Sequence, residues 1–303
     1  MSPLPTAPSL LRPFGRSGLQ TSALGFGAMH LNDDRSSEAE AGALLNAVLD
    51  LGVTLIDTAR SYGLSEERIG RHLAHRRSEF LLSTKLGYGV EGVPDWTYDC
   101  IVQGVERALR LMRTDVLDIA HLHSCPLETL LRGEVIRALD DCRRAGKIRV
   151  AAYSGENAEL DFSLAEDVFG AVQISVSVCD QGAVPQRLAQ AGARGVGVIA
   201  KRPLAGAIWR HAQRPDDFAE GRYWDRWQAM RLAELAQDLT PDELALRFAA
   251  WLPGVDSVIA GTRRLDNLKR NLAAIAKGPL PPGLQQALLD RFAPHAAQWP
   301  GLI

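Results

Sequence analysis

The sequence predicts an α/β fold, a (β/α)8 TIM barrel, and three observations carry that prediction. Eight short apolar or β-branched runs alternate with longer amphipathic stretches. They are spread over about 240 residues, and eight is the number of strands at which a parallel barrel of that size closes. No Ser/Gly-rich linker or low-complexity tract interrupts the alternation. A doubly wound sheet would alternate in the same way, but the count of eight favours the barrel.

The elements follow one another in a regular order. The opening LRPFGRSGLQ predicts a short hairpin around residues 15–18, after an N-terminal tail of about ten residues, 1–10. Strands are predicted from buried apolar runs such as VTLID and FLLSTK, at residues 22–28, 53–57, 80–85, 116–122, 148–153, 171–175, 196–200 and 257–260. Helices are predicted where apolar residues recur every three or four positions, at residues 37–51, 65–74, 98–113, 130–145, 157–168, 184–191, 227–237, 241–251, 265–276 and 283–292. We expect a single domain over residues 1–303, with the last helix added to the barrel.

One stretch has no predicted element. Residues 203–225 are too long for an ordinary connection and carry Trp209, Tyr223 and Trp224. Long loops in compact domains are usually functional lids or mobile insertions, so we expect a lid-like loop here.

Composition excludes several classes of protein. The 303 residues include 34 Lys+Arg and 36 Asp+Glu, a balance that does not predict a nucleic-acid partner. The cysteines Cys100, Cys125, Cys142 and Cys179 have neither disulfide nor zinc-ligand spacing, which favours a reduced compartment and predicts no metal site. No secretory signal and no apolar run of about 18 residues is found, so we expect a soluble, cytoplasmic protein without a membrane partner.

Four ionisable side chains stand where predicted strands end. Asp57, Lys85 and His123 end or follow three consecutive strands, and Tyr62 lies five residues after Asp57. Catalytic groups of a parallel barrel lie at this end of the strands. Each residue alone has an ordinary alternative: a helix N-cap, a rim charge, a turn aromatic or a hydrogen-bonded core histidine. Their joint placement predicts an active site.

The residues around these positions carry a family resemblance. The motifs are D-T-A-x-x-Y-G at 57–63, T-K at 84–85, L-H at 122–123, G-K-I-R-x4-S at 146–154, Gln173, and V-I-A-G-T-R-x7-N at 258–271. In this order and over nearly the whole chain, the sequence resembles the aldo-keto reductase superfamily. The resemblance implies a single barrel that binds a nicotinamide cofactor without a Rossmann unit and reduces aldehydes or ketones. It also implies that Asp57, Tyr62, Lys85 and His123 are catalytic.

The chemistry of carbonyl reduction suits these four groups. Hydride delivery to a carbonyl carbon leaves an alkoxide, so a proton donor must reach the oxygen as its charge develops. Tyr62 is the expected general acid, Lys85 would help the phenol lose its proton, and Asp57 would hold Lys85 in place. His123 would orient the carbonyl. His121 shares a strand face with His123, and we expect it to be a packed, hydrogen-bonded interior residue.

The cofactor residues come from the resemblance, because no G-x-G-x-x-G opens a helix. Ser154 and Gln173 would bind the nicotinamide carboxamide, and Pro203 and Leu204 would lie beside the pyrophosphate. The adenosine end would be surrounded by Gly261, Thr262, Arg263, Arg264, Asn267 and Asn271. The pair Arg263 and Arg264 suits a 2′-phosphate, so NADPH/NADP+ is expected, with NADH possible.

The chain departs from the family pattern at three places. Lys201 and Arg202 replace an aromatic–Ser pair whose ring stacks on the nicotinamide. Either cationic contacts to the pyrophosphate replace the lost stacking, or the cofactor binds more weakly. Gly155 stands where Asn is common and removes an amide ligand. Asn267 stands where Arg is frequent, which leaves Arg263 and Arg264 to contact the 2′-phosphate.

Substrate contacts are expected from side chains near the strand ends. Met29, His30, Tyr88, Trp209 and Trp224 would suit a hydrophobic small carbonyl compound, and would serve equally well as packing under the loop.

Three functions remain open from the sequence. The first is an NADP-dependent oxidoreductase that reduces an aldehyde or ketone or runs the reverse reaction. The second is a regulatory or redox-sensing subunit that binds the nucleotide with little turnover. The third is an unrelated barrel lyase with Lys85 as a Schiff base. The sequence predicts neither the physiological substrate, nor the direction of reaction, nor the oligomeric state.

Overall fold

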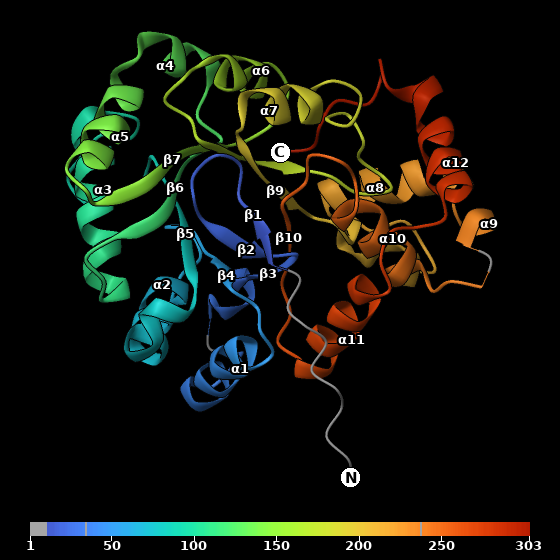
Figure 1. Ribbon diagram of the computed structural model, residues 1–303, viewed down its shortest axis with the longest axis horizontal. Helices are drawn as coiled ribbons and strands as arrows, with labels where there is room; N and C mark the ends of the chain where they lie inside the picture. The colour runs from blue at the N-terminus through green and yellow to red at the C-terminus, as the bar shows by residue number, and fades with distance from the viewer. Residues whose placement is uncertain (1–10, 34, 237) are drawn as a thin grey trace.

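The computed structural model of the protein describes residues 11–33, 35–236 and 238–303. Eight parallel strands close into a barrel in the order β10-β3-β4-β5-β6-β7-β8-β9 (Figure 1). They are β3 (Leu24–Gly27), β4 (Leu55–Asp57), β5 (Leu81–Leu86), β6 (Leu117–His123), β7 (Ile148–Ser154), β8 (Ala171–Ser175), β9 (Gly197–Lys201) and β10 (Ser257–Ala260). The predicted (β/α)8 barrel is confirmed.

Helices surround the barrel (Figure 1). They are α1 (Glu38–Asp50), α2 (Ser65–Leu73), α3 (Tyr98–Met112), α4 (Leu127–Arg132), α5 (Glu134–Arg144), α6 (Asn157–Ala165), α7 (Arg187–Arg194), α8 (Phe218–Ala229), α9 (Ala233–Ala236), α10 (Pro241–Ala250), α11 (Leu265–Ala276) and the additional C-terminal α12 (Pro282–Phe292). Short 3-10 turns are η1 (Ala28–Leu31), η2 (Ala74–Glu79), η3 (Ala205–Arg210) and η4 (Ala293–His295). The predicted N-terminal tail, residues 1–10, lies outside the described residues. In those that are described, no helix has the length and apolar character needed to span a membrane.

The prediction of an irregular stretch over residues 203–225 is wrong in its second half. There α8 begins at Phe218, with the Asp217 carboxylate accepting from the backbone N–H groups of Ala219 at 2.9 Å and Glu220 at 3.0 Å. The predicted helix 227–237 is therefore the end of α8 followed by α9, and its last residue, 237, lies outside the described residues. An N-cap aspartate at this position was a signal for the helix in the sequence.

A second difference lies in the predicted helix 130–145, which is two helices. Gly133, with φ +73°, ends α4 and precedes α5. A left-handed backbone at this glycine terminates one helix and redirects the chain, as glycine does at helix C-termini.

The predicted hairpin is present and closes one end of the barrel. Strands β1 (Leu11–Pro13) and β2 (Gln20–Ser22) pair antiparallel, and their turn carries Phe14, which is fully buried. Arg16 N–H donates to the Gly195 carbonyl at 2.8 Å and fastens the turn to the chain before β9. Phe14 packs with the first inward-facing residues of the strands, which are Leu55, Leu81, Ile119, Val150, Ala152, Ala171 and Ile199.

The interior of the barrel changes character along its axis. Alternate residues of a strand share a face, so Leu55 is followed inside by Asp57, and Leu81 by Ser83 and Lys85. Apolar side chains fill the end that the hairpin covers, and polar side chains collect at the carboxyl ends of the strands. The fold therefore gathers ionisable groups at one opening of an otherwise apolar barrel.

Candidate active site

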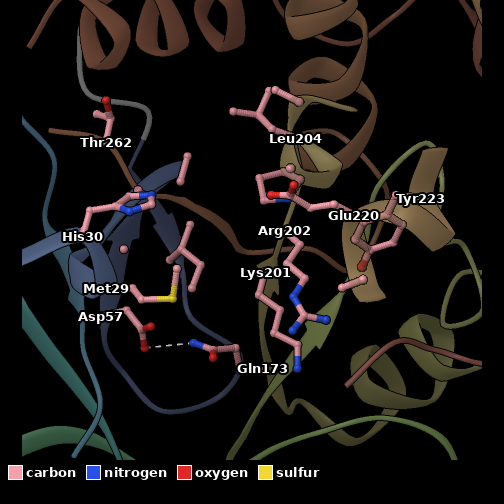
Figure 2. Close-up of a pocket in the computed structure, with 18 of the residues that line it drawn as sticks. Met29, His30, Asp57, Gln173, Lys201, Arg202, Leu204, Glu220, Tyr223 and Thr262 are labelled. Carbon is pink, nitrogen blue, oxygen red and sulfur yellow. Dashed lines mark hydrogen bonds between the residues drawn. The ribbon is translucent and has the colours of Figure 1, made fainter. Parts of the chain in front are cut away.

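One cavity of about 680 Å3 lies at the carboxyl ends of the strands. Strand ends supply Asp57, Lys85, His123, Ser154, Gln173 and Lys201, and the loop after β4 supplies Tyr62. Figure 2 shows Met29 and His30 on one side of the cavity and Lys201, Arg202 and Tyr223 on the other. The four residues predicted to be catalytic all line this cavity.

Asp57 and Lys85 form a buried ion pair. Lys85 Nζ donates to Asp57 Oδ2 at 2.5 Å and to the Thr58 carbonyl at 2.8 Å, and both side chains are 2% exposed. Burial by itself lowers the pKa of Lys85, but the Asp57 carboxylate and the adjacent Tyr62 outweigh it, and the pKa lies above its ordinary value. Lys85 therefore keeps its positive charge at the base of the cavity.

The second oxygen of Asp57 is held by neutral donors. Ser83 Oγ donates to Asp57 Oδ1 at 2.7 Å, and Gln173 Nε2 donates to the same oxygen at 2.8 Å (Figure 2). Ser154 Oγ in turn donates to Gln173 Oε1 at 3.2 Å, and His121 Nε2 lies 3.0 Å from Ser83 Oγ. Side chains from β4 through β8 thus fix the carboxylate in one orientation.

Tyr62 lies beside this pair in a tightly constrained loop. Lys85 Nζ is 5.1 Å from the centre of the Tyr62 ring, and the His123 ring meets it edge-on with centroids 6.4 Å apart. The next residue, Gly63, has φ +46°, and a Cβ there would lie 2.1 Å from the Asn32 carbonyl oxygen. Only glycine fits this close approach, so the Y-G pair of the motif has a steric reason.

The two histidines of β6 differ in their surroundings. His123 lines the cavity, whereas His121 is fully buried and bonds Ser83. Burial lowers the pKa of each to about 3, and the ammonium groups of Lys85 and Lys201 act in the same direction. Both imidazoles are neutral at physiological pH, so each carries a single N–H.

A second lysine–carboxylate pair lies at the ends of β7 and β9. Lys201 Nζ is 3.0 Å from Glu156 Oε1, which also accepts from the Ser175 backbone N–H at 2.8 Å. The aromatic–Ser position of the family pattern is therefore filled by a paired lysine. Sequence reasoning missed Glu156, although a carboxylate two residues after the strand-ending Ser154 was a signal of the kind that identified Asp57.

Arg202 follows Lys201 and also lines the cavity. It has φ +56°, and its guanidinium donates to the Leu302 carbonyl at 2.7 Å. Glu220 and Tyr223 from α8 line the cavity beside it; sequence reasoning named Tyr223 only as part of the lid-like loop and did not name Glu220. Residues near the end of the described chain thus help to form this wall.

The far part of the cavity has the character of a nucleotide site. Pro203, Leu204, Gly261, Thr262, Asn267 and Asn271 line it, as does Arg270, which sequence reasoning did not name. Glycines stand side by side at the ends of β3 and β10, where a Cβ on Gly261 would lie 2.7 Å from the Gly27 carbonyl oxygen. This leaves a backbone-lined floor that side chains do not fill. The residues present fit an elongated ligand with an anionic end.

The two adjacent arginines behave differently. Arg263 Nε donates to the His30 carbonyl at 2.9 Å, and its guanidinium lies 3.4 Å from Asp33 Oδ1. Arg264 is exposed, and its guanidinium makes no hydrogen bond to any described residue. Neither side chain lines the cavity itself. Of the predicted pair, Arg264 has the free donors.

Of the five residues predicted to contact substrate, two line the cavity and three do not. Met29 and His30 line the cavity, and Tyr88 instead lies 2.6 Å from His123 Nδ1 through its hydroxyl. Trp209 donates to Asp242 Oδ1 at 2.8 Å and packs on Trp227, while Trp224 is half-buried against the core. Trp209 and Trp224 thus serve as packing.

Neither metal ligands nor disulfides contribute to the site in the part of the chain that the structure describes. No group of three or more His, Cys, Asp or Glu side chains there could hold a metal ion. The four cysteines are free and buried.

Comparison with known proteins agrees with this site. A model of the aldo/keto reductase family matches residues 23–284. L-galactose dehydrogenase of Arabidopsis thaliana is 27% identical over 284 residues, covering 88% of each chain. An aldo-keto reductase of Schizosaccharomyces pombe named with NADP(+) is 29% identical over 291 residues, covering 84% of this chain and 83% of that protein. The holo form of an aldo-keto reductase from Bacillus halodurans has a TM-score of 0.81 at 27% identity, covering 93% of this chain and 95% of that one.

The chain belongs to the aldo/keto reductase family. The fold, the ordered motifs and the relatives named above agree on an oxidoreductase of the kind that uses NAD(P)H. The predicted family membership is confirmed.

Proposed function

We propose that this protein interconverts an aldehyde or ketone and its alcohol with NADPH/NADP+, and that Tyr62 is the general acid in reduction. The observation that carries the proposal is the position of Tyr62. Its side chain lines the cavity, and its ring centre is 5.1 Å from Nζ of the charged Lys85. A phenol is a suitable proton donor to a developing alkoxide, and a fixed ammonium stabilises the phenolate that remains. Asp57 keeps that ammonium in place at 2.5 Å.

The nicotinamide cofactor, when bound, supplies or accepts the hydride. Ser154 and Gln173 would hold its carboxamide, and Pro203 and Leu204 would lie along the pyrophosphate, because all four line the cavity between the catalytic residues and β10. Gly261, Thr262, Asn267, Arg270 and Asn271 would surround the adenosine end.

The NADP preference depends on guanidinium groups near the start of α11. Arg264 is exposed, with no hydrogen bond from its guanidinium to a described residue, and Arg270 lines the cavity six residues further along the chain, about 1.7 helical turns. Guanidinium forks match phosphate oxygens, so these two side chains are the proposed contacts for a 2′-phosphate. Arg263 instead holds the His30 carbonyl and Asp33, which positions the adjacent loop.

The proton path begins at Tyr62 and is completed by solvent. In reduction, Tyr62 transfers its hydroxyl proton to the carbonyl oxygen, and His123 donates a hydrogen bond to the same oxygen. Lys85 holds the charge left on the phenolate, and solvent reprotonates Tyr62 after the alcohol leaves. The apolar barrel end beneath Asp57 excludes water from the ion pair, which strengthens its electrostatic effect.

The test is NADPH consumption with a panel of aldehydes and ketones. We expect turnover by the wild type and a loss of at least about 100-fold in Tyr62→Phe, the range expected for removing a general acid. Tyr98→Phe is the matched control, because Tyr98 lies on α3 outside the cavity and its hydroxyl bonds Asp141.

Three outcomes separate the functions left open by the sequence. NADPH binding without turnover on any substrate would favour a regulatory subunit with little turnover. Failure to bind either nucleotide would overturn both nucleotide-dependent functions. Trapping of a carbonyl compound on Lys85 by borohydride would favour the Schiff-base lyase, because reduction makes an imine permanent.

A further inference from the structure

Tyr88 places its hydroxyl against a ring nitrogen of His123. Its oxygen lies 2.6 Å from His123 Nδ1 and 3.2 Å from Ser61 Oγ. The two rings are stacked, with centroids 5.7 Å apart and an interplanar angle of 23°. Tyr88 comes two residues after β5 and is not among the residues that line the cavity. Tyr88 therefore contacts the imidazole at Nδ1 without itself lining the cavity.

The Tyr88 hydroxyl has one hydrogen and two polar neighbours, His123 Nδ1 at 2.6 Å and Ser61 Oγ at 3.2 Å. We assign the hydrogen to the nearer neighbour, so that Tyr88 donates and Nδ1 accepts. The imidazole is neutral, because burial and two nearby ammonium groups keep the pKa of His123 far below neutrality. With Nδ1 unprotonated, its single hydrogen is on Nε2.

The other nitrogen is free to act in the cavity. His123 lines the cavity, and no described residue makes a hydrogen bond to its Nε2. The Tyr62 ring meets the imidazole edge-on at 6.4 Å. An Nε2–H would therefore be available to a ligand atom held beside the Tyr62 hydroxyl.

Trp96 and Gly87 restrict the position of the Tyr88 ring. Trp96 packs edge-on against it with centroids 5.8 Å apart, and Trp96 N–H donates to the Gly87 carbonyl at 2.8 Å. Trp96 has φ +59°, a left-handed conformation that costs a non-glycine residue about 1–2 kcal/mol. Gly87 has φ +132°, and a Cβ there would lie 2.0 Å from the indole. Strain of this kind next to an active site is a feature that the surrounding structure must maintain.

We propose that Tyr88 is a positioning residue that holds His123 in the tautomer with hydrogen on Nε2. The imidazole then donates to the carbonyl oxygen that receives the proton from Tyr62. This last step rests on the proposed function, whereas the tautomer is a property of the protein without any ligand. A histidine with hydrogen on Nδ1 would instead present a lone pair to the carbonyl oxygen and repel it.

Nitrogen NMR of the histidine side chains tests the tautomer directly. The full-length protein is labelled with 15N-histidine, and His123→Asn identifies the signals of His123. We expect the wild type to show hydrogen on Nε2 and an Nδ1 signal shifted toward that of a hydrogen-bonded acceptor. Hydrogen on Nδ1 in the wild type would overturn the proposal, and this measurement needs no variant of Tyr88.

Tyr88→Phe then tests whether the Tyr88 hydroxyl sets the tautomer of His123. Phenylalanine keeps the stacking and removes the hydroxyl, so the Nδ1 signal should move toward that of a free or partly protonated nitrogen. Tyr98→Phe should leave it unchanged. An Nδ1 signal that does not move in Tyr88→Phe would overturn the role of Tyr88.

Kinetics separate this proposal from the function on which it rests. In Tyr88→Phe we expect kcat to fall about tenfold, roughly one lost hydrogen-bond donor in the transition state, with the NADPH Kd unchanged. A changed NMR signal together with full kcat would overturn the link to catalysis. If the wild type reduces no carbonyl compound, the proposed function fails and the tautomer result stands independently.

Discussion

Two lysine–carboxylate pairs face the same cavity, and they differ in what surrounds each ammonium group. Lys85 bonds both Asp57 and the Thr58 carbonyl, and its pKa is raised despite complete burial. Lys201 bonds Glu156, and burial together with the positive charge of Arg202 nearby lowers its pKa. The pKa of the ammonium group is thus raised in the pair at β5 and lowered in the pair at β9.

The difference indicates a division of roles. A group that stabilises a phenolate must remain charged throughout the reaction, and Lys85, next to Tyr62, meets this requirement. Lys201 lies where family members have a ring for the nicotinamide, and its partner among the described residues is Glu156, not a tyrosine. We interpret the first pair as part of the proton path and the second as part of the wall of the cavity.

The largest expected effect comes from removing each ammonium in turn. Lys85→Met should lower kcat about 1,000-fold, because the phenolate of Tyr62 loses its electrostatic support. Lys201→Met should lower kcat by less than about tenfold and act mainly on KM or on the NADPH Kd. Steady-state kinetics and fluorescence titration with NADPH measure both. Equal losses of kcat in the two variants would mean that the pairs share one role.

Removing the carboxylate of each pair should lower the free energy of unfolding by different amounts. Asp57→Ala leaves Lys85 as a buried unpaired charge and should cost about 3–5 kcal/mol in the free energy of unfolding. Glu156→Ala should cost less, because burial and Arg202 lower the pKa of Lys201 and so favour its uncharged form. Urea unfolding at pH 7 measures both.

The double variant Asp57→Ala/Lys85→Met provides the control for this prediction. It removes the unpaired charge and should recover part of the stability lost in Asp57→Ala. No recovery would show that the cost comes from the hydrogen bonds of Ser83 and Gln173 to Asp57 and not from Lys85.

His121, linked through Ser83 to the first pair, should make the protein sensitive to acid. Burial lowers its pKa from 6.5 to about 3, so the unfolded chain takes up the proton first as the pH falls. Its contribution to stability is complete above about pH 6.5 and is lost progressively toward pH 3, at about 1.4 kcal/mol per pH unit. In His121→Gln, the decrease between pH 7 and pH 5 should be smaller by about 2 kcal/mol.

A buried carboxylate near the second pair acts with the opposite sign. Burial raises the pKa of Asp180 to about 7, so the folded protein binds that proton more tightly than the unfolded chain and gains stability as the pH falls from 7. Asp180 is present in both His121→Gln and the wild type, so its contribution cancels when the pH dependences of their stabilities are subtracted. An identical pH dependence in the two proteins would contradict a neutral buried His121.

The smallest expected effect concerns the phosphate end of the cofactor. Arg264→Ala and Arg270→Ala should each lower the preference for NADPH over NADH about tenfold, the scale of one charge-assisted contact. Arg263→Ala should change it less, because this side chain holds His30 and Asp33. A larger change in Arg263→Ala than in the other two would reverse the assignment.

Much of the fold and the first pair could be predicted from local sequence. Buried apolar runs ending in Asp57 and Lys85 located both the strands and the opening at which those residues meet. In a parallel barrel, the ends of neighbouring strands are neighbours in space, so position in sequence was enough. The helix α8 was missed because Gly221 and the aromatic residues around it obscure the periodicity, although Asp217 caps its start.

The second pair and the role of Tyr88 could not be predicted in the same way. The position of Glu156 after β7 marked it as a candidate, but it meets Lys201 at the end of β9, with β8 between them, and nothing near Lys201 indicates that the two would pair. Tyr88 lies beyond the end of β5, and its direction depends on the left-handed backbone at Trp96 and the close packing at Gly87. Tertiary contacts of this kind are not contained in the periodicity of either segment.

The central claim is that Tyr62, supported by the first pair, gives the proton in carbonyl reduction. A single-turnover experiment tests it most directly, with enzyme preloaded with NADPH and mixed rapidly with the best carbonyl compound of the panel. We predict that Tyr62→Phe binds NADPH with an unchanged Kd but oxidises it at least about 100-fold more slowly than the wild type. A single-turnover rate within about threefold of the wild type would contradict the account, because that is less than 1 kcal/mol of barrier.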